Sequence, residues 1–384
     1  MKLTGIITLV VSLIIGLSTF ILPQDERSEL EGRYLETINQ VDPERTVTGL
    51  AMKEVETAFN DQLTFRNNIF GLNSILLDSL QVNYRNGIYI GKDNFLFSGI
   101  AYEPKSVEEL EVIADEKYNN IVRLRESAHD DSLFIFTPIF FKALVHDEKL
   151  PNNYLTSGFN TEKIAELIED KMRESDLDIK IVDGTHSLVD HKDDYVYFYT
   201  DHHYTGLGAY YVYQDILTAI NNNTEWNLTL PAYDEFESAI VPGNFVGSQA
   251  RILGNVTYSE IDYLEIALPK NMPNYKRWDN GTETSTPLVQ FDNRNSYSNY
   301  MGSDYANTVI KTDNPKEYPK ILIIGDSFTN AIEALAVYNA SEMHSIDPRY
   351  YKGNLYEYIA DIKPDVTIVM RDTLLYNTYM NSGD

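Results

Sequence analysis

The stretch ILIIGDSFTNAIEAL, residues 321–335, has the pattern of a strand, a turn and a helix in succession. Its four leading apolar residues predict a buried strand, Gly325 and Asp326 a tight turn, and the residues after Ser327 a helix. Open α/β sheets bind ligands at the carboxyl ends of their strands. Ser327 would stand at that edge, where the N–H groups of a helix N-terminus can stabilise an oxyanion. Gly-Asp-Ser is also an ordinary turn, so the tripeptide alone leaves a nucleophile and a solvated turn both open.

In the rest of the chain from residue 106 onward, predicted helices alternate with apolar strands. Helical periodicity marks 106–128 and 160–175, and strand-like runs occupy 132–139 and 177–184. Helix and strand return together at 319–370. This order predicts an α/β fold with a largely parallel sheet. The segment from about 222 to 316 is rich in Asn, Thr, Tyr and Pro, and we expect an irregular β-rich insertion with strands at PLVQF (287–291) and NTVIK (307–311).

The N-terminal part has a different pattern. Residues 27–80 are mostly helical in periodicity, and NGIYIGKDNFLFSG (86–99) predicts a hairpin. We therefore divide the chain into a leading segment (1–22), a helical region (23–90) that packs on the catalytic domain, and an α/β domain (91–384) that contains the insertion.

Residues 3–22 carry no charge and would span ~30 Å as a helix, the thickness of a bilayer core. Lys2 precedes this run and acidic residues follow it, which predicts an N-terminal anchor with the rest of the chain outside the cytoplasm. A cleaved signal peptide, which would make the protein secreted, is the alternative.

The composition excludes several classes of function. A net charge of −27 argues against binding to nucleic acid or to anionic lipid. With no cysteine, the chain has neither disulfides nor thiolate metal sites.

A second chemical motif is TDHHYTGLGAYYVY, residues 200–213. A serine nucleophile needs a base, and the base needs an orienting group. On an extended backbone Asp201 and His203 would face one side and His202 the other. We therefore expect His203 to be the base of Ser327 and Asp201 to orient its ring.

Other interpretations of these polar residues remain. A metal cluster could use His186, His191, His202, His203, Asp183, Asp193 and Asp194, although adjacent histidines on an extended chain diverge. Lys142 and His146 follow a strand, where side chains are normally solvated. Tyr195, Tyr197 and Tyr199 alternate like one face of a strand. The 28 tyrosines suit sugar stacking or an aromatic core.

The motifs together resemble a family. Residues 200–213 resemble the Asp-x-His-Trp-Thr-x-x-Gly-Ala segment of DHHW proteins and of alginate O-acetyltransferase-like proteins, SGNH-hydrolase relatives of bacterial cell envelopes. GDSF (325–328) is similar to their nucleophile block. The resemblance extends from Phe59 to Arg371 through segments 59–74, 86–99, 136–151, 346–351 and 362–372.

The resemblance implies an SGNH-like three-layer fold with Asp201, His203 and Ser327 as catalytic residues. Here the histidine precedes the serine, unlike typical SGNH hydrolases, and Tyr204 replaces the usual tryptophan. The Gly and Asn blocks of the ordinary oxyanion hole are not recognisable. The Ser327 N–H is then the expected donor, with Asn330 and Arg371 as further candidates.

The resemblance also implies a function. We expect an extracytoplasmic, membrane-anchored O-acetyltransferase that modifies a cell-envelope or exported polysaccharide through an acyl-serine. No cofactor or metal is expected, and a membrane-bound O-acyltransferase would supply the acyl group because acetyl-CoA is not expected outside the cytoplasm. A glycan O-acetyl esterase with the same triad and a non-catalytic glycan-binding or assembly protein are the alternatives.

Overall fold

The computed structural model describes residues 2–28, 33–37, 52–98, 105–139, 142–152, 154, 158–254, 257–258, 260–291 and 296–372. The chain divides into two compact units. The first comprises Met1–Ile88 with Ser248–Ser259, and the second comprises Tyr89–Gly247 with Glu260–Asp384.

The first unit is built mainly from helices. They are α1 (Lys2–Ser18), α3 (Met52–Gln62), α4 (Arg66–Ser79) and α10 (Ser248–Leu253). Helices α3 and α4 agree with the mostly helical pattern predicted for 27–80, although β1 (Arg27–Ser28) pairs with β2 (Arg33–Tyr34) in an antiparallel ladder. The part of that prediction at 38–51 lies outside the described residues.

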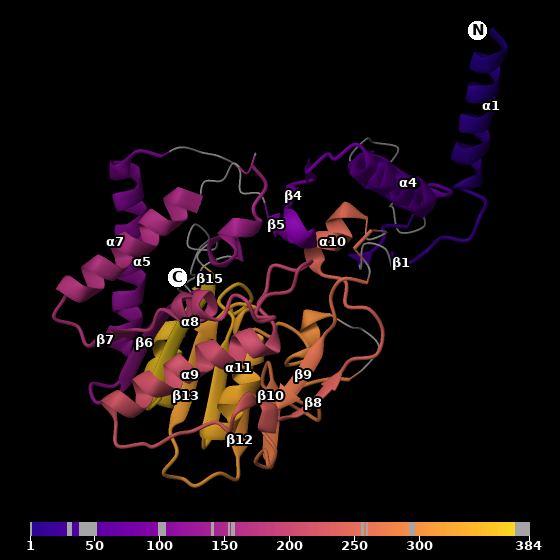
Figure 1. Cartoon of the computed structure of the whole chain (residues 1–384). Coiled ribbons are helices and arrows are strands. Elements are labelled where there is room, and N and C mark those ends of the chain that lie inside the picture. The colour runs from indigo at the N-terminus through magenta and orange to yellow at the C-terminus, as the bar shows by residue number, and fades with distance from the viewer. Residues whose placement is uncertain are drawn as a thin grey trace. The chain divides into compact units, whose positions relative to one another are not determined.

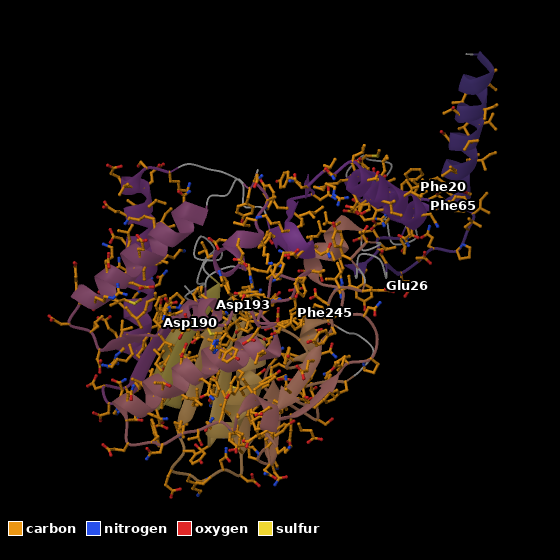
Figure 2. All side chains as sticks on the ribbon, in the orientation of Figure 1. Phe20, Glu26, Phe65, Asp190, Asp193 and Phe245 are labelled. Atoms are coloured by element: carbon orange, nitrogen blue, oxygen red, sulfur yellow. The ribbon has the colours of Figure 1, made fainter. Side chains whose placement is uncertain are left out.

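Helix α1 exposes its large apolar side chains (Figure 2). None of the helices in the described part of the chain has both the length and the apolar character that crossing a membrane requires.

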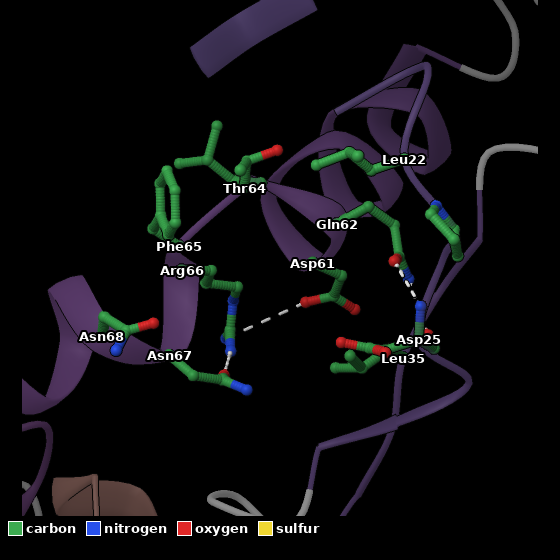
Figure 3. Close-up of a pocket in the computed structure, with 12 residues that line it drawn as sticks. Leu22, Asp25, Leu35, Asp61, Gln62, Thr64, Phe65, Arg66, Asn67 and Asn68 are labelled. Atoms are coloured by element: carbon green, nitrogen blue, oxygen red, sulfur yellow. Dashed lines mark hydrogen bonds and ion pairs between the residues drawn. The ribbon is translucent and has the colours of Figure 1, made fainter. Parts of the chain in front are cut away.

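A cavity of about 230 Å³ lies in the first unit, between the end of α3 and the start of α4 (Figure 3). Gln62 organises one wall: its Oε1 accepts from the Asp25 N–H at 2.9 Å, and its Nε2 donates to the Asp25 and Glu36 carbonyls. The described lining residues include no histidine and no serine, so this cavity is no candidate for serine catalysis.

The second unit is organised by an eight-stranded sheet of order β11-β10-β12-β14-β13-β15-β6-β7. Its strands are β6 (Leu133–Ile139), β7 (Ile179–Ile181), β10 (Tyr275–Asp279), β11 (Thr282–Thr284), β12 (Asn307–Thr312), β13 (Lys320–Gly325), β14 (Glu342–Ile346) and β15 (Val366–Asp372). The five strands from β14 to β7 are parallel, and the other three are antiparallel. The predicted largely parallel sheet is confirmed.

Helices cover both faces of this sheet (Figure 1). Along β13, Ile321 and Ile323 face a core shared with α9 (Gly206–Asn223) and α11 (Thr329–Ala336), with α8 (Gly184–Asp190) on the same side. Leu322 and Ile324 face the opposite core, with α5 (Val107–Ser127), α7 (Gly158–Glu174) and α12 (Leu355–Ile362). Alternate strand residues thus bury two apolar layers, which gives the expected three-layer α/β fold.

The predicted hairpin and the predicted helix after it are both present. The hairpin at 86–99 appears as β4 (Ile88–Ile90) and β5 (Leu96–Ser98) around a 3₁₀ turn at Lys92–Asn94, and β3 (Tyr84–Arg85) completes its small sheet. Helix α5 begins at the predicted place, because Ser106 and Glu109 form a reciprocal capping box. The short helix α6 (Lys142–Val145) follows β6.

The segment 222–316 is more regular than expected. β10, β11 and β12 extend the main sheet, and β8 (Glu237–Ile240) pairs with β9 (Glu265–Leu268). The strand predicted at 307–311 is confirmed as β12. The one predicted at 287–291 is wrong, since only Val289 there forms a bridge, with Tyr300.

Candidate active site

The turn after β13 presents Ser327 at the carboxyl edge of the sheet. The Asp326 carboxylate accepts from the Phe328 N–H at 3.1 Å, and the Asp326 carbonyl accepts from Thr329. Gly325 is required here, because a Cβ would lie 2.2 Å from Thr329 Cγ2 and 2.5 Å from the Met370 carbonyl oxygen. This tight turn leaves Ser327 partly exposed while its neighbours are buried.

Ser327, His203 and Asp201 form one hydrogen-bonded chain. His203 Nε2 lies 2.8 Å from Ser327 Oγ, and His203 Nδ1 lies 2.6 Å from Asp201 Oδ1. Both His203 and Asp201 are buried. An ionised Asp201 accepts from Nδ1–H, which leaves Nε2 free to accept the serine proton. The structure therefore brings together the three residues that the sequence singled out.

The backbone that carries this pair is a bend. The His203 N–H donates to Asp201 Oδ1 at 3.1 Å, so the aspartate folds the chain back on itself. The His202 ring consequently lies 3.8 Å from the His203 ring, and its Nδ1 is 3.4 Å from Asp201 Oδ1. The expectation of an extended backbone with His202 pointing away is wrong.

Aromatic rings hold His203 in place. Tyr297 stacks on the imidazole with centroids 3.8 Å apart and planes within 5°. Phe328 packs at 4.8 Å, and its carbonyl accepts from the Tyr204 hydroxyl. Tyr297 lies in the loop-rich segment before β12, where no sequence pattern distinguishes it.

Two buried charges anchor the segment that leads to Asp201. Lys142 Nζ donates to the carbonyls of Phe198, Tyr199 and Asp201 at 3.2, 3.1 and 2.7 Å. Asp262 accepts from the N–H groups of Tyr199 and Thr200 and from the Thr200 hydroxyl. The sequence gives no local signal for either anchor, because their partners are distant along the chain.

Lys142 and His146 were expected to be solvated, and this expectation is wrong. They are only 3% and 2% exposed. Burial lowers the pKa of Lys142 to about 7, although the charges of Asp262 and Asp201 oppose the shift. Burial likewise lowers the pKa of His146 to about 4.

The three proposed oxyanion donors differ in whether they already donate a hydrogen bond. The Asn330 amide is engaged, because its Nδ2 donates to Asp304 Oδ1 at 2.8 Å. Asp304 also pairs with Arg349 at 2.9 Å. The Arg371 side chain lies outside the described residues, although its backbone belongs to β15. Among the described hydrogen bonds none uses the Ser327 N–H, which leaves that group available to an oxyanion.

The alternative interpretation, a metal cluster, does not assemble as a whole. Within the described residues, donor atoms of Asp201, His202 and His203 come within 4.8 Å of one another. His186 instead pairs with Asp190 at 3.6 Å, and His191 packs on a tyrosine of α9. Asp201 Oδ1 and His203 Nδ1 already bond to each other, so the catalytic geometry and metal ligation would compete for the same atoms.

The strand expected at Tyr195–Tyr199 is also absent from the described fold. Tyr197 forms one bridge, to Tyr204. Tyr195 and Tyr199 stack on each other at 5.5 Å instead of alternating with Tyr197 along one strand face.

A family model described as DHHW protein matches residues 170–346, which include Asp201, His203 and Ser327. The predicted resemblance to the DHHW family is confirmed.

A DHHW family protein from Eubacterium siraeum is 19% identical, with a TM-score of 0.58 over 78% of this chain and 95% of that one. Bacillus cereus PatB1 is 20% identical, with a TM-score of 0.60 over 76% and 98%, and a second PatB1 structure carries a sulfonyl adduct. The O-acetyltransferase domain of Pseudomonas putida AlgJ is 14% identical, with a TM-score of 0.49 over 76% and 93%. A search of curated proteins finds no match. At these identities the DHHW protein and PatB1 share the fold of this chain.

Proposed function

We propose that this DHHW protein is an O-acetyltransferase that modifies a cell-envelope or exported polysaccharide through an acyl-Ser327 intermediate. The observation that carries the proposal is the hydrogen-bonded order Asp201–His203–Ser327 at the carboxyl edge of the sheet. The choice of acetyl transfer rests on the family resemblance of the sequence.

The geometry supports a two-step acyl transfer. Ser327 Oγ would attack the donor carbonyl while its proton passes to His203 Nε2, 2.8 Å away. The buried Asp201 would stabilise the imidazolium, and the Ser327 N–H would stabilise the oxyanion. His203 would then return the proton to the leaving group. In the second step it would take a proton from a sugar hydroxyl that attacks the acyl-serine, and would return that proton to Ser327 Oγ as the bond between the acyl group and Ser327 breaks.

The proposal includes location and donor. The uncharged run near the N-terminus supports export of the chain, either anchored or secreted after cleavage. An exported enzyme would lack acetyl-CoA, so we propose that a membrane-bound O-acyltransferase supplies the acyl group.

Covalent labelling tests the nucleophile. Sulfonyl reagents form stable adducts with activated hydroxyls, and PatB1 has been solved with a sulfonyl adduct. An aryl sulfonyl fluoride should add one sulfonyl group to Ser327, located by peptide mass spectrometry. Ser327→Ala and His203→Ala should stay unlabelled, whereas Ser303→Ala, which removes an exposed serine, should label normally. Unlabelled wild-type protein would leave the non-catalytic alternative standing.

Product analysis separates transfer from hydrolysis. With a small activated acetyl ester and oligosaccharides, the transferase should yield acetylated oligosaccharide in addition to acetate. Acetate alone across neutral, amino and acidic oligosaccharides would favour the esterase.

A further inference from the structure

A cavity of about 490 Å³ lies beside the segment that leads to the triad. Tyr199 lines it and stands two residues before Asp201. Lys142 Nζ bonds the carbonyls of both residues, so the wall of the cavity and the catalytic aspartate share one anchor. The size of the cavity is that of a small-molecule site.

Tyrosine rings line one side of the cavity, and Tyr195 stacks on both Tyr199 and Tyr263. Tyr195 and Tyr199 stack at 5.5 Å with planes 27° apart. The Tyr195 hydroxyl donates to Asp262 at 2.6 Å, which fixes its ring. Both rings are partly exposed. Such rings combine an apolar face with a polar tip, which suits the apolar face and hydroxyl rim of a sugar.

A buried polar group without a partner also lines the cavity. His146 is 2% exposed, and neither ring nitrogen has a hydrogen-bond partner in the described structure. The nearest carboxylate, Glu148, is 3.7 Å from Nδ1. Buried polar atoms are nearly always satisfied, so an unsatisfied imidazole at a cavity indicates a ligand that can both donate and accept. A sugar hydroxyl does both.

The charges of the cavity select among sugars. Its two lysines are already paired: Lys149 with Asp93 at 2.6 Å and Lys192 with Glu148 at 3.3 Å. Two further carboxylates line it, those of Asp193 and Asp194, and Asp193 is labelled in Figure 2. The lining therefore carries four carboxylates against two ammonium groups. That balance repels an acidic sugar and attracts an amine.

We propose that this cavity is the acceptor subsite and binds a neutral or amine-bearing sugar unit while rejecting uronates. The proposal rests on the proposed function and narrows its substrate class. The partly exposed Tyr199 ring packs against the sugar, His146 bonds a hydroxyl, and Asp193 and Asp194 set the charge preference.

Calorimetry on the full-length Ser327→Ala variant tests binding without turnover. The probes are glucosamine oligomers, N-acetylglucosamine oligomers and oligouronates, at a mildly acidic pH that keeps the amines charged. Both amine and neutral oligomers should bind, and oligouronates at least about tenfold more weakly. Added salt should narrow that difference. Oligouronates that bind as tightly as the others, or no binding by any probe, would overturn the proposal.

Two variants locate the site. Adding Tyr199→Ala should weaken binding of the neutral oligomer about tenfold or more. Adding Asp193→Asn keeps a surface residue polar and should bring the affinities for amine and uronate closer together. Asp130→Asn, a matched change at another exposed aspartate, should alter neither. Unchanged binding in both Tyr199→Ala and Asp193→Asn would place any binding elsewhere.

Binding and labelling separate the two proposals. Sulfonyl labelling of Ser327 without oligosaccharide binding would remove the subsite and keep the nucleophile. Oligosaccharide binding without labelling would keep the subsite and remove Ser327 as the nucleophile.

Discussion

Replacing Lys142 with methionine tests whether the buried ammonium holds the catalytic segment in place. The change keeps an unbranched side chain that is one atom shorter, and it removes three donated hydrogen bonds. The Tyr199 carbonyl keeps a second donor, the Leu96 N–H at 2.8 Å. The carbonyls of Phe198 and Asp201 lose the ammonium donor.

The magnitude follows from these carbonyls. Each buried acceptor left without its donor costs about 1–3 kcal/mol. Removing a buried charge returns part of this cost, because the ammonium no longer has to be desolvated. We expect Lys142→Met to lower the free energy of unfolding by about 2–4 kcal/mol at neutral pH. Asp201 should also lose its fixed position, so turnover of an acetyl ester should fall about tenfold or more.

The pH dependence gives a sharper test. Burial lowers the pKa of Lys142 to about 7 in the folded protein, whereas a lysine in the unfolded chain titrates near ~10.4. Between these values the unfolded chain holds a proton that the folded chain has lost, so Lys142 makes stability rise with pH. The slope is at most about 1.4 kcal/mol per pH unit. The methionine variant lacks this contribution, and its deficit should therefore grow from pH 7 towards pH 10.

Urea unfolding followed by circular dichroism measures these differences. Lys163→Met, at an exposed lysine paired with Glu166, is the control and should change stability by less than about 0.5 kcal/mol. Stabilities of wild type and Lys142→Met that run parallel from pH 7 to 10 would refute the lowered pKa. A neutral-pH deficit as small as that of the control would refute the anchoring role.

Three further predictions concern the same unit. Gly247→Ala should destabilise the protein and lower acetyl-ester turnover, because the new Cβ would meet the Thr200 carbonyl oxygen at 2.1 Å; urea unfolding and turnover measure both. Asp201→Asn should lower kcat about 10⁴-fold with folding intact, since it removes control of the imidazole tautomer, whereas His202→Ala should leave most of kcat. Arg277→Met should cost about 3–5 kcal/mol in urea unfolding, because the arginine is 1% exposed and bonds a buried aspartate and three carbonyls.

Each of these has its own contradicting result. Normal turnover in Gly247→Ala would mean that the Thr200 segment shifts without consequence. An active Asp201→Asn would remove the carboxylate from the mechanism. A stable Arg277→Met would show that the buried Asp279 does not depend on its arginine partner.

The central strand β13 could be predicted from the sequence because its signal is local. Four consecutive apolar residues buried on two faces, followed by glycine and then a helix, allow few other structures. Its neighbour β14 could not be predicted from the sequence. Three of its five residues are polar, and each is satisfied only by the fold: His344 bonds Glu342 and Tyr358, and Ser345 bonds Glu333 of α11. A polar strand in mid-sheet has no periodicity to detect.

The same limit applies to the anchors of the catalytic segment. Lys142 lies 59 residues before its partner Asp201, and Asp262 lies 62 residues after Thr200. A lysine at the end of a strand is expected to be exposed to solvent unless buried carbonyls converge on it. The sequence shows no sign of that convergence.

The two histidines show where a local rule can select a residue for the wrong reason. Strand alternation favoured His203 over His202 by placing them on opposite faces, yet Nδ1 of His202 and Nδ1 of His203 both lie near Asp201 Oδ1, at 3.4 and 2.6 Å. What distinguishes them is the turn: Asp201 accepts the His203 N–H as well as its Nδ1–H, so backbone and ring are fixed by one oxygen. Only that ring then directs Nε2 at Ser327. Asparagine at position 201 could keep the backbone bond through its carbonyl oxygen but would no longer supply a negative charge to a protonated ring. Asp201→Asn should therefore separate the structural role of the turn, which it retains, from the catalytic role of the charge, which it loses.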